Sequence, residues 1–176
     1  MSSLDSASGI AAAPGPLRLV QSFAGTLSAD QDADPLRTRE AAIGWLRAAA
    51  LLPDEAGLSN SEHGALLGLR EAIRDSLAAH TGGRADEEAA ARLTKALADG
   101  RLVITVDPAS AVRLVSAARA SYPGIVAAVA VAIGDAAASG TWLRLKSCSA
   151  ARCGQAFYDD SASSAARRCP AHADDA

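Results

Sequence analysis

Aromatic side chains and positive charge are both scarce in this sequence. Phe, Trp and Tyr make up 3% of its 176 residues, so any hydrophobic core must be aliphatic. The formal net charge is −3 at pH 7, and the pI is about 5.6. A polycation that coats nucleic acid is therefore excluded, whereas a local basic patch is compatible with this composition.

Long apolar runs and a secretory leader are missing as well. The longest apolar run, 125–133, has nine residues, whereas a membrane-spanning helix needs about 20. Residues 1–16 lack the basic start and the strong apolar stretch of a secretion signal. Their Ser, Ala, Gly and Pro content predicts a flexible arm instead. We expect a soluble, cytoplasmic protein with no membrane partner.

A disulfide framework is also not expected, because the chain has three cysteines and all of them follow residue 147. Cysteines clustered near a histidine favour metal binding in a reducing compartment. Hydrophobic residues, in contrast, are plentiful at 49% of the chain, which excludes wholesale disorder. The length predicts one domain, or one domain with a small appendage.

Apolar spacing and capping signals predict four helices. The first follows the N-cap Thr38 to about residue 51, and the second begins at Ser59, whose distance from Glu62 is that of a capping box. The third follows Asp86 to about residue 98, and the fourth runs from Pro123 to about residue 138. The expected core residues on these helices are Leu46, Leu66, Leu69, Ile73, Leu97, Val129 and Ile133.

Alternating side chains predict a β-hairpin between the last two helices, with strands at 102–106 and 112–116 around a Pro-containing turn. Residues 142–146 are a third strand candidate, and residues 17–23 fit a strand or a helical turn. The fold class is therefore mainly α with a small β-hairpin, an α+β arrangement. We further expect core anchors at Trp45 and Trp142, surface or boundary histidines at His63 and His80, and a solvated helix face formed by Arg70, Arg74 and Asp75.

The pattern with the most specific chemistry lies near the C-terminal end. Cys148, Cys153, Cys169 and His172 form the pattern C-x4-C-x15-C-x2-H. Zn²⁺ takes four N or S ligands in a tetrahedron, and a short Cys-Cys spacing lets one turn offer two thiolates. The spacing predicts a Zn²⁺ site, with three free cysteines as the alternative. His172 is the candidate fourth ligand, and Asp174 or water would be its substitutes.

The metal is expected to be structural rather than catalytic. A catalytic zinc site keeps one position open and has a general base nearby. Here four donors are available, and the candidate bases all lie in a polar tail: Asp159, Asp160, Asp174 and Asp175. We therefore expect no enzymatic activity. The loop between Cys153 and Cys169 is expected to form a small hairpin around Phe157 and Tyr158.

Several stretches of this chain carry a resemblance to a known family. GTWLRLKSC at 140–148, CGQAFYDDS at 153–161 and ARRC at 166–169 resemble bacterial proteins that join an ABATE domain to a CGNR zinc finger, described as candidate stress-induced transcription regulators. The segments LRLVQSFAGT, AIGWLRAAALL and LREAIRDSL resemble the ABATE domain itself. The resemblance implies an ABATE-like helical domain at 17–140, followed at 141–176 by a treble-clef or zinc-ribbon-like finger and a short tail.

The chain departs from this family at the end of the finger. The family finger closes with a second C-x4-C pair, but Asp174 holds the position of its last cysteine and no Gly-Asn-Arg follows. Ala162, Ser164 and Ala166 stand where the family has basic residues. From residue 144 onward, the sequence has five basic and four acidic residues. Three thiolates and one Zn²⁺ then bring the net charge of this segment to about zero. Because DNA affinity depends largely on phosphate neutralisation, DNA binding is expected to be weak or lost.

Two functions from different classes follow from these features. The first, implied by the resemblance, is a zinc-binding transcription regulator that contacts DNA weakly through Arg152, Arg167 and Arg168, with a homodimer as one option. The second is a zinc-stabilised module that binds a protein or a small ligand without DNA contact. The sequence names no such ligand, and we adopt the first function as the sequence-based prediction.

Overall fold

The computed structural model describes residues 10–27, 34–118 and 120–173. Residues 1–9 of the predicted flexible arm lie outside the described residues. The remainder of that segment contacts the first helix, because the Ala13 N–H donates a hydrogen bond to Gln21 Oε1 at 2.7 Å. No helix in the described ranges is long and apolar enough to cross a membrane.

The described part of the chain contains five α-helices: α1 (Leu17–Ala24), α2 (Arg39–Ala48), α3 (Asn60–Gly82), α4 (Glu87–Leu97) and α5 (Tyr122–Ala138). The predicted caps are confirmed, since the side chains of Thr38, Ser59 and Asp86 each accept a hydrogen bond from a backbone N–H three residues on. The capping box of Ser59 and Glu62 is present. The segment that fitted either a strand or a helical turn is the helix α1.

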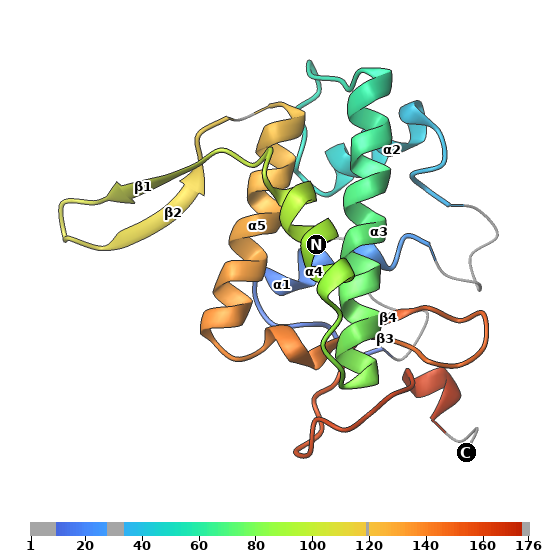
Figure 1. The fold of residues 1–176 in the computed structure, drawn as a ribbon. Coiled ribbons are helices and arrows are strands. Elements are labelled where there is room, and N and C mark those ends of the chain that lie inside the picture. Colours follow the sequence, from blue (N-terminus) through green and yellow to red (C-terminus); the bar gives the residue numbers. More distant parts are fainter. Residues whose placement is uncertain (1–9, 28–33, 119, 174–176) are drawn as a thin grey trace.

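Helix α3 is the axis of the fold, and α1, α4 and α5 pack around it (Figure 1). Its Leu66, Leu69 and Ile73 are fully buried at helical spacing. Of the predicted core residues, Leu97 and Ile133 are half-buried at the edge of the core, and the other five are fully buried. The predicted fold class, mainly helical with small β-structure, is confirmed.

The predicted first hairpin is confirmed as well. Strand β1 (Leu102–Val106) pairs antiparallel with β2 (Val112–Ser116). Asp107 closes the turn, because its Oδ1 accepts hydrogen bonds from the N–H groups of Ala109 and Ala111. The hairpin extends from the helical body as an arm (Figure 1), with β2 packed against α5 at its base.

A second hairpin lies beside the C-terminal end of α3 (Figure 1). The 3-10 turn η1 (Trp142–Arg144) leads into β3 (Leu145–Ser147), which pairs antiparallel with β4 (Ala156–Tyr158). The third strand thus begins later than predicted. The small hairpin does not lie within the loop before Cys169, because β4 finds its partner in the segment that precedes Cys148.

The solvated helix face predicted on α3 is wrong for its two arginines. Arg70 is 4% exposed and forms an ion pair with Asp34 at 2.7 Å. Arg74 donates hydrogen bonds to three backbone carbonyls, one of which belongs to Gly154. A guanidinium carries five N–H donors and can satisfy several buried carbonyls at once. The helical spacing of charged residues in the sequence does not show whether an arginine does this. Asp75 does lie at the surface, where it pairs with Arg92 at 3.1 Å.

Candidate metal centre

The four residues of the cysteine-histidine pattern come together around one point. Their ligand atoms all lie within 4.8 Å of one another. Cys153 Sγ is 3.9 Å from Cys169 Sγ, and His172 Nδ1 is 3.8 Å from Cys148 Sγ and 3.3 Å from Cys169 Sγ. The structure therefore gathers the whole predicted ligand set, whereas the substitute ligand Asp174 lies outside the described residues.

The spacing of these atoms fits one small metal ion. Metal–ligand distances of about 2.0–2.3 Å in a tetrahedron separate neighbouring ligand atoms by about 3.5–3.8 Å. The three separations given above, 3.3–3.9 Å, agree with this geometry, and the remaining pairs of ligand atoms lie within 4.8 Å. They exclude a disulfide between Cys153 and Cys169, whose sulfurs would be about 2.05 Å apart, and all three cysteines are free.

The first two ligands are presented by a tight turn between the short strands. Cys148 follows β3 and Cys153 precedes β4, and the Cys148 N–H donates to the Gln155 carbonyl at 2.9 Å. The turn needs left-handed backbone at Arg152 and Gly154, with φ of 65° and 58°. A side chain at Gly154 would also place its Cβ 2.7 Å from the Arg74 guanidinium. Glycine at 154 therefore avoids the strain of left-handed backbone, which Arg152 tolerates, and leaves space for the Arg74 guanidinium.

The other two ligands lie on one short turn. Cys169 is the N-cap of the 3-10 helix η2 (Pro170–His172), and the His172 N–H donates to the Cys169 carbonyl at 2.9 Å. This geometry places the thiol and the imidazole on one side. The Ser149 N–H bonds the Arg167 carbonyl at 2.9 Å and so joins this turn to the first one.

The electrostatics of the three thiols favour a cation between them. Burial raises the pKa of Cys153 to about 12, and the neighbouring Cys148 adds to the increase. Burial likewise raises the pKa of Cys169. The pKa of Cys148 is lowered, because hydrogen bonds to its sulfur outweigh the opposing effect of burial. Three adjacent thiolates repel one another, so the full ligand set needs a divalent cation to supply the missing charge.

A buried ion pair supports the segment that leads to Cys169. Lys146 Nζ lies 2.8 Å from Asp159 Oδ2, and the two side chains are 6% and 1% exposed. Lys146 also donates to the carbonyls of Ser164 and Ala166. Burial opposes ionisation of Asp159, but hydrogen bonds from Lys146 and Ser161 outweigh it and lower the pKa of Asp159 to about 2. Sequence reasoning missed this pair and assigned Asp159 to a polar tail.

Helix α3 holds the second hairpin in place through polar side chains near its end. His80 Nδ1 lies 2.8 Å from the Leu145 carbonyl, and Thr81 exchanges hydrogen bonds with the backbone of Ser147. The His80 ring also meets Trp142 edge-on, with ring centroids 4.9 Å apart. Burial lowers the pKa of His80. The predicted boundary histidine thus positions β3, and no residue pattern along the chain had indicated this role.

The three arginines predicted to contact nucleic acid lie next to metal ligands in the chain, since Arg152 precedes Cys153 and Arg167 and Arg168 precede Cys169. Arg152 and Arg167 are exposed, and Arg168 is half-buried. Within the described ranges, none of the ion pairs involves these three residues. The other two basic residues of this region already have partners within the protein. Lys146 is buried, and Arg144 donates hydrogen bonds to the carbonyls of Asp159 and Ser161.

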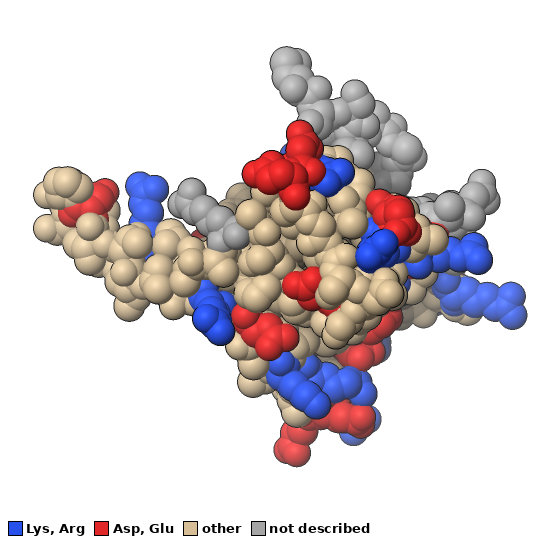
Figure 2. Space-filling view, turned by 90° about the horizontal axis from the view of Figure 1, so that it is seen from above, with Lys and Arg blue, Asp and Glu red and all other residues tan. Residues whose placement is uncertain are grey.

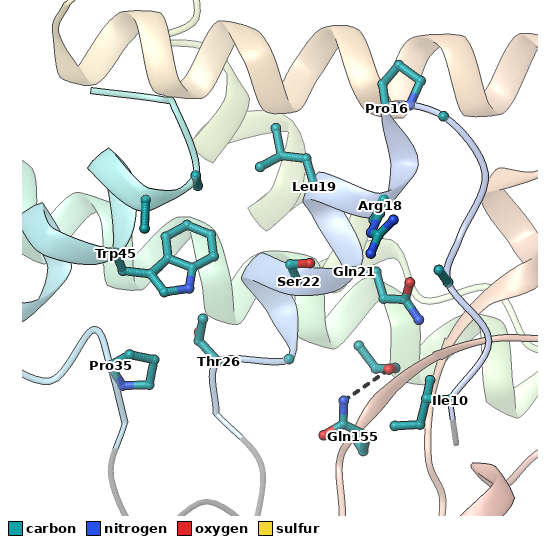
Figure 3. A pocket seen from close by; sticks show the side chains of 16 residues that line it. Ile10, Pro16, Arg18, Leu19, Gln21, Ser22, Thr26, Pro35, Trp45 and Gln155 are labelled. Carbon is teal, nitrogen blue, oxygen red and sulfur yellow. Dashed lines mark hydrogen bonds between the residues drawn. The ribbon is translucent and has the colours of Figure 1, made fainter. Parts of the chain in front are cut away.

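A second candidate site is a cleft of about 800 Å³ beside α1 (Figure 3). Trp45, Leu19 and Pro35 contribute apolar surface to it, and Gln21 and Thr26 are among its polar residues. Both polar side chains already have protein partners. The Gln21 amide bonds the backbone of residues 11 and 13, and Thr26 Oγ1 bonds the Phe23 carbonyl and Arg70. These two polar groups are therefore already committed to the protein itself.

Comparison with known proteins identifies the helical part of the chain. A model of the ABATE family, described as "Putative stress-induced transcription regulator", matches residues 17–141. This range contains α1 to α5 and ends before the first metal ligand. No curated protein matches the chain. The family match therefore does not cover the metal ligands, and a metal site is inferred from the arrangement of its four residues.

Proposed function

This chain belongs to the ABATE family, and we propose that it is a transcription regulator whose C-terminal segment folds around Zn²⁺ and contacts DNA weakly. The observation that carries the proposal is the set of four ligand atoms, which lie within 4.8 Å of one another beside three arginines. The family's description supports the regulatory role.

Zinc is the metal that suits this donor set best. Three thiolates and one imidazole are soft donors, and a tetrahedral arrangement of S and N ligands is typical of structural zinc. Cys148, Cys153, Cys169 and His172 would hold the ion. Because the protein supplies all four ligands, no position is left for water or substrate. We therefore assign no catalytic step to the ion or to the protein, and the metal would supply folding energy to the segment.

The expected DNA contact is weak because few basic side chains are available for phosphates. Arg152, Arg167 and Arg168 remain, and each phosphate contact adds about 0.9 to the slope of log affinity against log salt. Two or three contacts correspond to a slope of about −2 to −3 and a Kd at or above roughly 10⁻⁵ M at physiological salt. On the face drawn in Figure 2, basic groups lie beside acidic groups over much of the molecule, and some basic groups gather at its right-hand edge.

The test combines metal analysis with salt-dependent DNA binding. Purified protein should contain about one Zn²⁺ per chain, and fluorescence anisotropy with duplex DNA should give the shallow salt slope. The double variant Arg167→Ala with Arg168→Ala should remove most of the binding. The matched control, Arg37→Ala with Arg84→Ala, removes the same charge from exposed positions elsewhere and should leave binding unchanged. Equal losses in both variants would contradict a DNA contact at the metal centre.

A second candidate function is a zinc-stabilised protein-interaction module without DNA contact. The observation that favours it is the burial of Lys146 against Asp159, which removes one more cation from the phosphate-binding set. If the wild-type protein binds one Zn²⁺ but shows no salt-dependent DNA binding, this second function replaces the first. A cytoplasmic location is compatible with either.

A further inference from the structure

The arm formed by β1 and β2 exposes a continuous apolar face. Ile104 lies opposite Leu114, and Val106 lies opposite Val112, so the four side chains share one side of the hairpin. They are 69%, 43%, 63% and 66% exposed, in that order. Figure 2 shows the arm as mostly uncharged surface. Contiguous exposed apolar surface of this kind marks an interaction site.

Strand β1 is also an open edge. The Ala117 N–H donates to the Arg101 carbonyl at 2.8 Å, and the Asp107 N–H donates to the Ala111 carbonyl at 3.1 Å. Hydrogen-bonded pairs recur at every second residue of an antiparallel ladder, so residues 103 and 105 also bond to β2. The N–H and C=O groups that point to the open side therefore belong to Leu102, Ile104 and Val106. None of the charges or prolines that usually shield an edge strand occurs at 102–106.

We propose that β1 pairs antiparallel with β1 of a second copy of this chain, about a two-fold axis at Ile104, and that the two hairpins form one four-stranded sheet. In this register Ile104 of one copy faces Ile104 of the other, and Leu102 faces Val106. These residues carry the outward backbone groups, so every such pair forms hydrogen bonds in both directions. Their side chains lie on the apolar face, and each gains an apolar cross-strand neighbour.

The same register brings opposite charges together. With Ile104 on the axis, Arg101 of one copy lies opposite Asp107 of the other, and the two-fold axis repeats this pair. Arg101 is exposed and forms no ion pair among the described residues. Asp107 uses Oδ1 for its turn, which leaves Oδ2 for the arginine. A slip of one residue would turn every apolar side chain to the opposite face and break these matches.

The outer edge of β2 offers no comparable match. Pairing two copies of β2 about Leu114 would set Val112 against Ser116 and would bring the two Arg113 side chains close together on one face. The base of β2 is also packed against α5. The β1 edge is therefore the self-complementary one. It lies far from the metal ligands, because the arm and the C-terminal segment extend from different ends of the molecule (Figure 1).

The proposal is tested by the mass of the full zinc-loaded chain in sedimentation velocity. The short seam is smaller than a standard interface, so we expect a reversible dimer with a Kd of roughly 1–100 µM. Ile104→Lys places two ammonium groups at the axis and should leave only the 17.7 kDa monomer. Its matched control is Val112→Lys, which changes a residue of the same face and similar exposure, 66% against 69%, but off the seam. This control should keep the dimer.

Two further measurements report on the register. The amides of Leu102 and Val106 should exchange more slowly as the wild-type concentration rises, and should remain fast in Ile104→Lys. Arg101→Glu should raise the dimer Kd about tenfold, since two attractive pairs become repulsive. A monomer at concentrations about tenfold above the expected Kd range would overturn the proposal. Equal loss of the dimer in Ile104→Lys and Val112→Lys would also overturn it, because that result indicates face-to-face packing.

Discussion

The two hairpins of this molecule are stabilised in opposite ways. The β1–β2 hairpin has five residues in each strand, all but two of them Val, Ile, Leu or Thr, yet most of its side chains are exposed. The β3–β4 hairpin has three residues in each strand, but Leu145, Ala156 and Phe157 are almost fully buried. Strand propensity favours the longer hairpin, whereas burial favours the shorter one.

Burial of the shorter hairpin comes from contacts outside the strands. Helix α3 bonds the backbone of β3 through His80 and Thr81, and Arg74 bonds the turn before β4. The metal ligands begin where β3 ends and where β4 begins. An isolated two-stranded hairpin is marginal in water, so a hairpin needs such external partners. The β1–β2 arm has few of them within one chain, which is why a second copy is its proposed partner.

Removal of the metal should have the largest effect, and only on the side of the short hairpin. A chelator is expected to unfold residues 148–173, because so short a segment cannot bury enough apolar surface alone. Structural zinc supplies about 10–16 kcal/mol of apparent binding energy in zinc-finger peptides. The helical circular dichroism signal and the amide protection of α3 should remain. Cys153→Ser should reproduce this pattern without a chelator, and collapse of the helical signal in either case would contradict it.

The second effect compares one residue from the first strand of each hairpin, Lys146 in β3 and Thr105 in β1. Lys146→Ala leaves the Asp159 carboxylate buried without its partner and should cost about 3–5 kcal/mol in urea unfolding. Thr105→Ala, at an exposed position of β1, should cost less than about 0.5 kcal/mol.

The double variant Lys146→Ala with Asp159→Ala separates the charge from the packing. It should be more stable than Lys146→Ala alone, because the uncompensated carboxylate is gone. If the single and double variants unfold at the same urea concentration, the ion pair contributes nothing and Lys146 acts only by filling space.

The third effect compares two isoleucines. Ile73 in α3 is 0% exposed and Ile104 in β1 is 69% exposed. Ile73→Ala should therefore destabilise the protein by about 2–5 kcal/mol. Ile104→Ala should cost less than about 0.5 kcal/mol when measured on dilute, monomeric protein. Similar losses in the two variants would mean that the arm is packed in the monomer after all.

The features that the sequence predicted correctly depend on residues that are close together in the chain. Caps at Thr38, Ser59 and Asp86 depend on a side chain and an N–H three residues away, and both are visible in the sequence. Each half of the metal centre is likewise formed by residues that are close together in the chain. Cys148 and Cys153 flank one turn, and Cys169 and His172 share another, so only the meeting of the two halves had to be inferred.

Contacts between distant residues account for what the sequence did not predict. Arg74 reaches the Gly154 carbonyl 80 positions further along the chain, and Arg70 pairs with Asp34 across 36 positions. Charge at helical spacing is usually solvated, so neither contact has a local signal. The pairing of Lys146 with Asp159 also depends on the fold, because β3 and β4 must be adjacent before the two charges can meet.

The smallest expected effect is the pH dependence of stability that the ion pair between Asp34 and Arg70 gives to the helical body. Burial opposes ionisation of Asp34, but hydrogen bonds from the Arg70 side chain and the Leu36 N–H outweigh it and lower the pKa of Asp34 below its ordinary value of 3.8. Since the pKa is lower in the folded state, the ion pair stabilises the protein fully above that ordinary value, and the contribution is lost as the pH falls further. We expect the effect to be smaller than that of the Lys146–Asp159 pair, because the Asp34 side chain is 16% exposed and the Asp159 side chain only 1%.

Chelated protein is the right sample, because acid would otherwise release the metal and unfold the C-terminal segment in the same range. Urea midpoints followed by helical circular dichroism should fall for the wild type between about pH 5 and pH 3. Asp34→Asn cannot ionise, so its midpoint should be lower at neutral pH and should fall less steeply over that interval. Asp75→Asn removes one carboxylate from an exposed pair with Arg92 and is the matched control for the loss of one negative charge. Parallel curves for wild type and Asp34→Asn would show that the Arg70 pair does not stabilise the helical body.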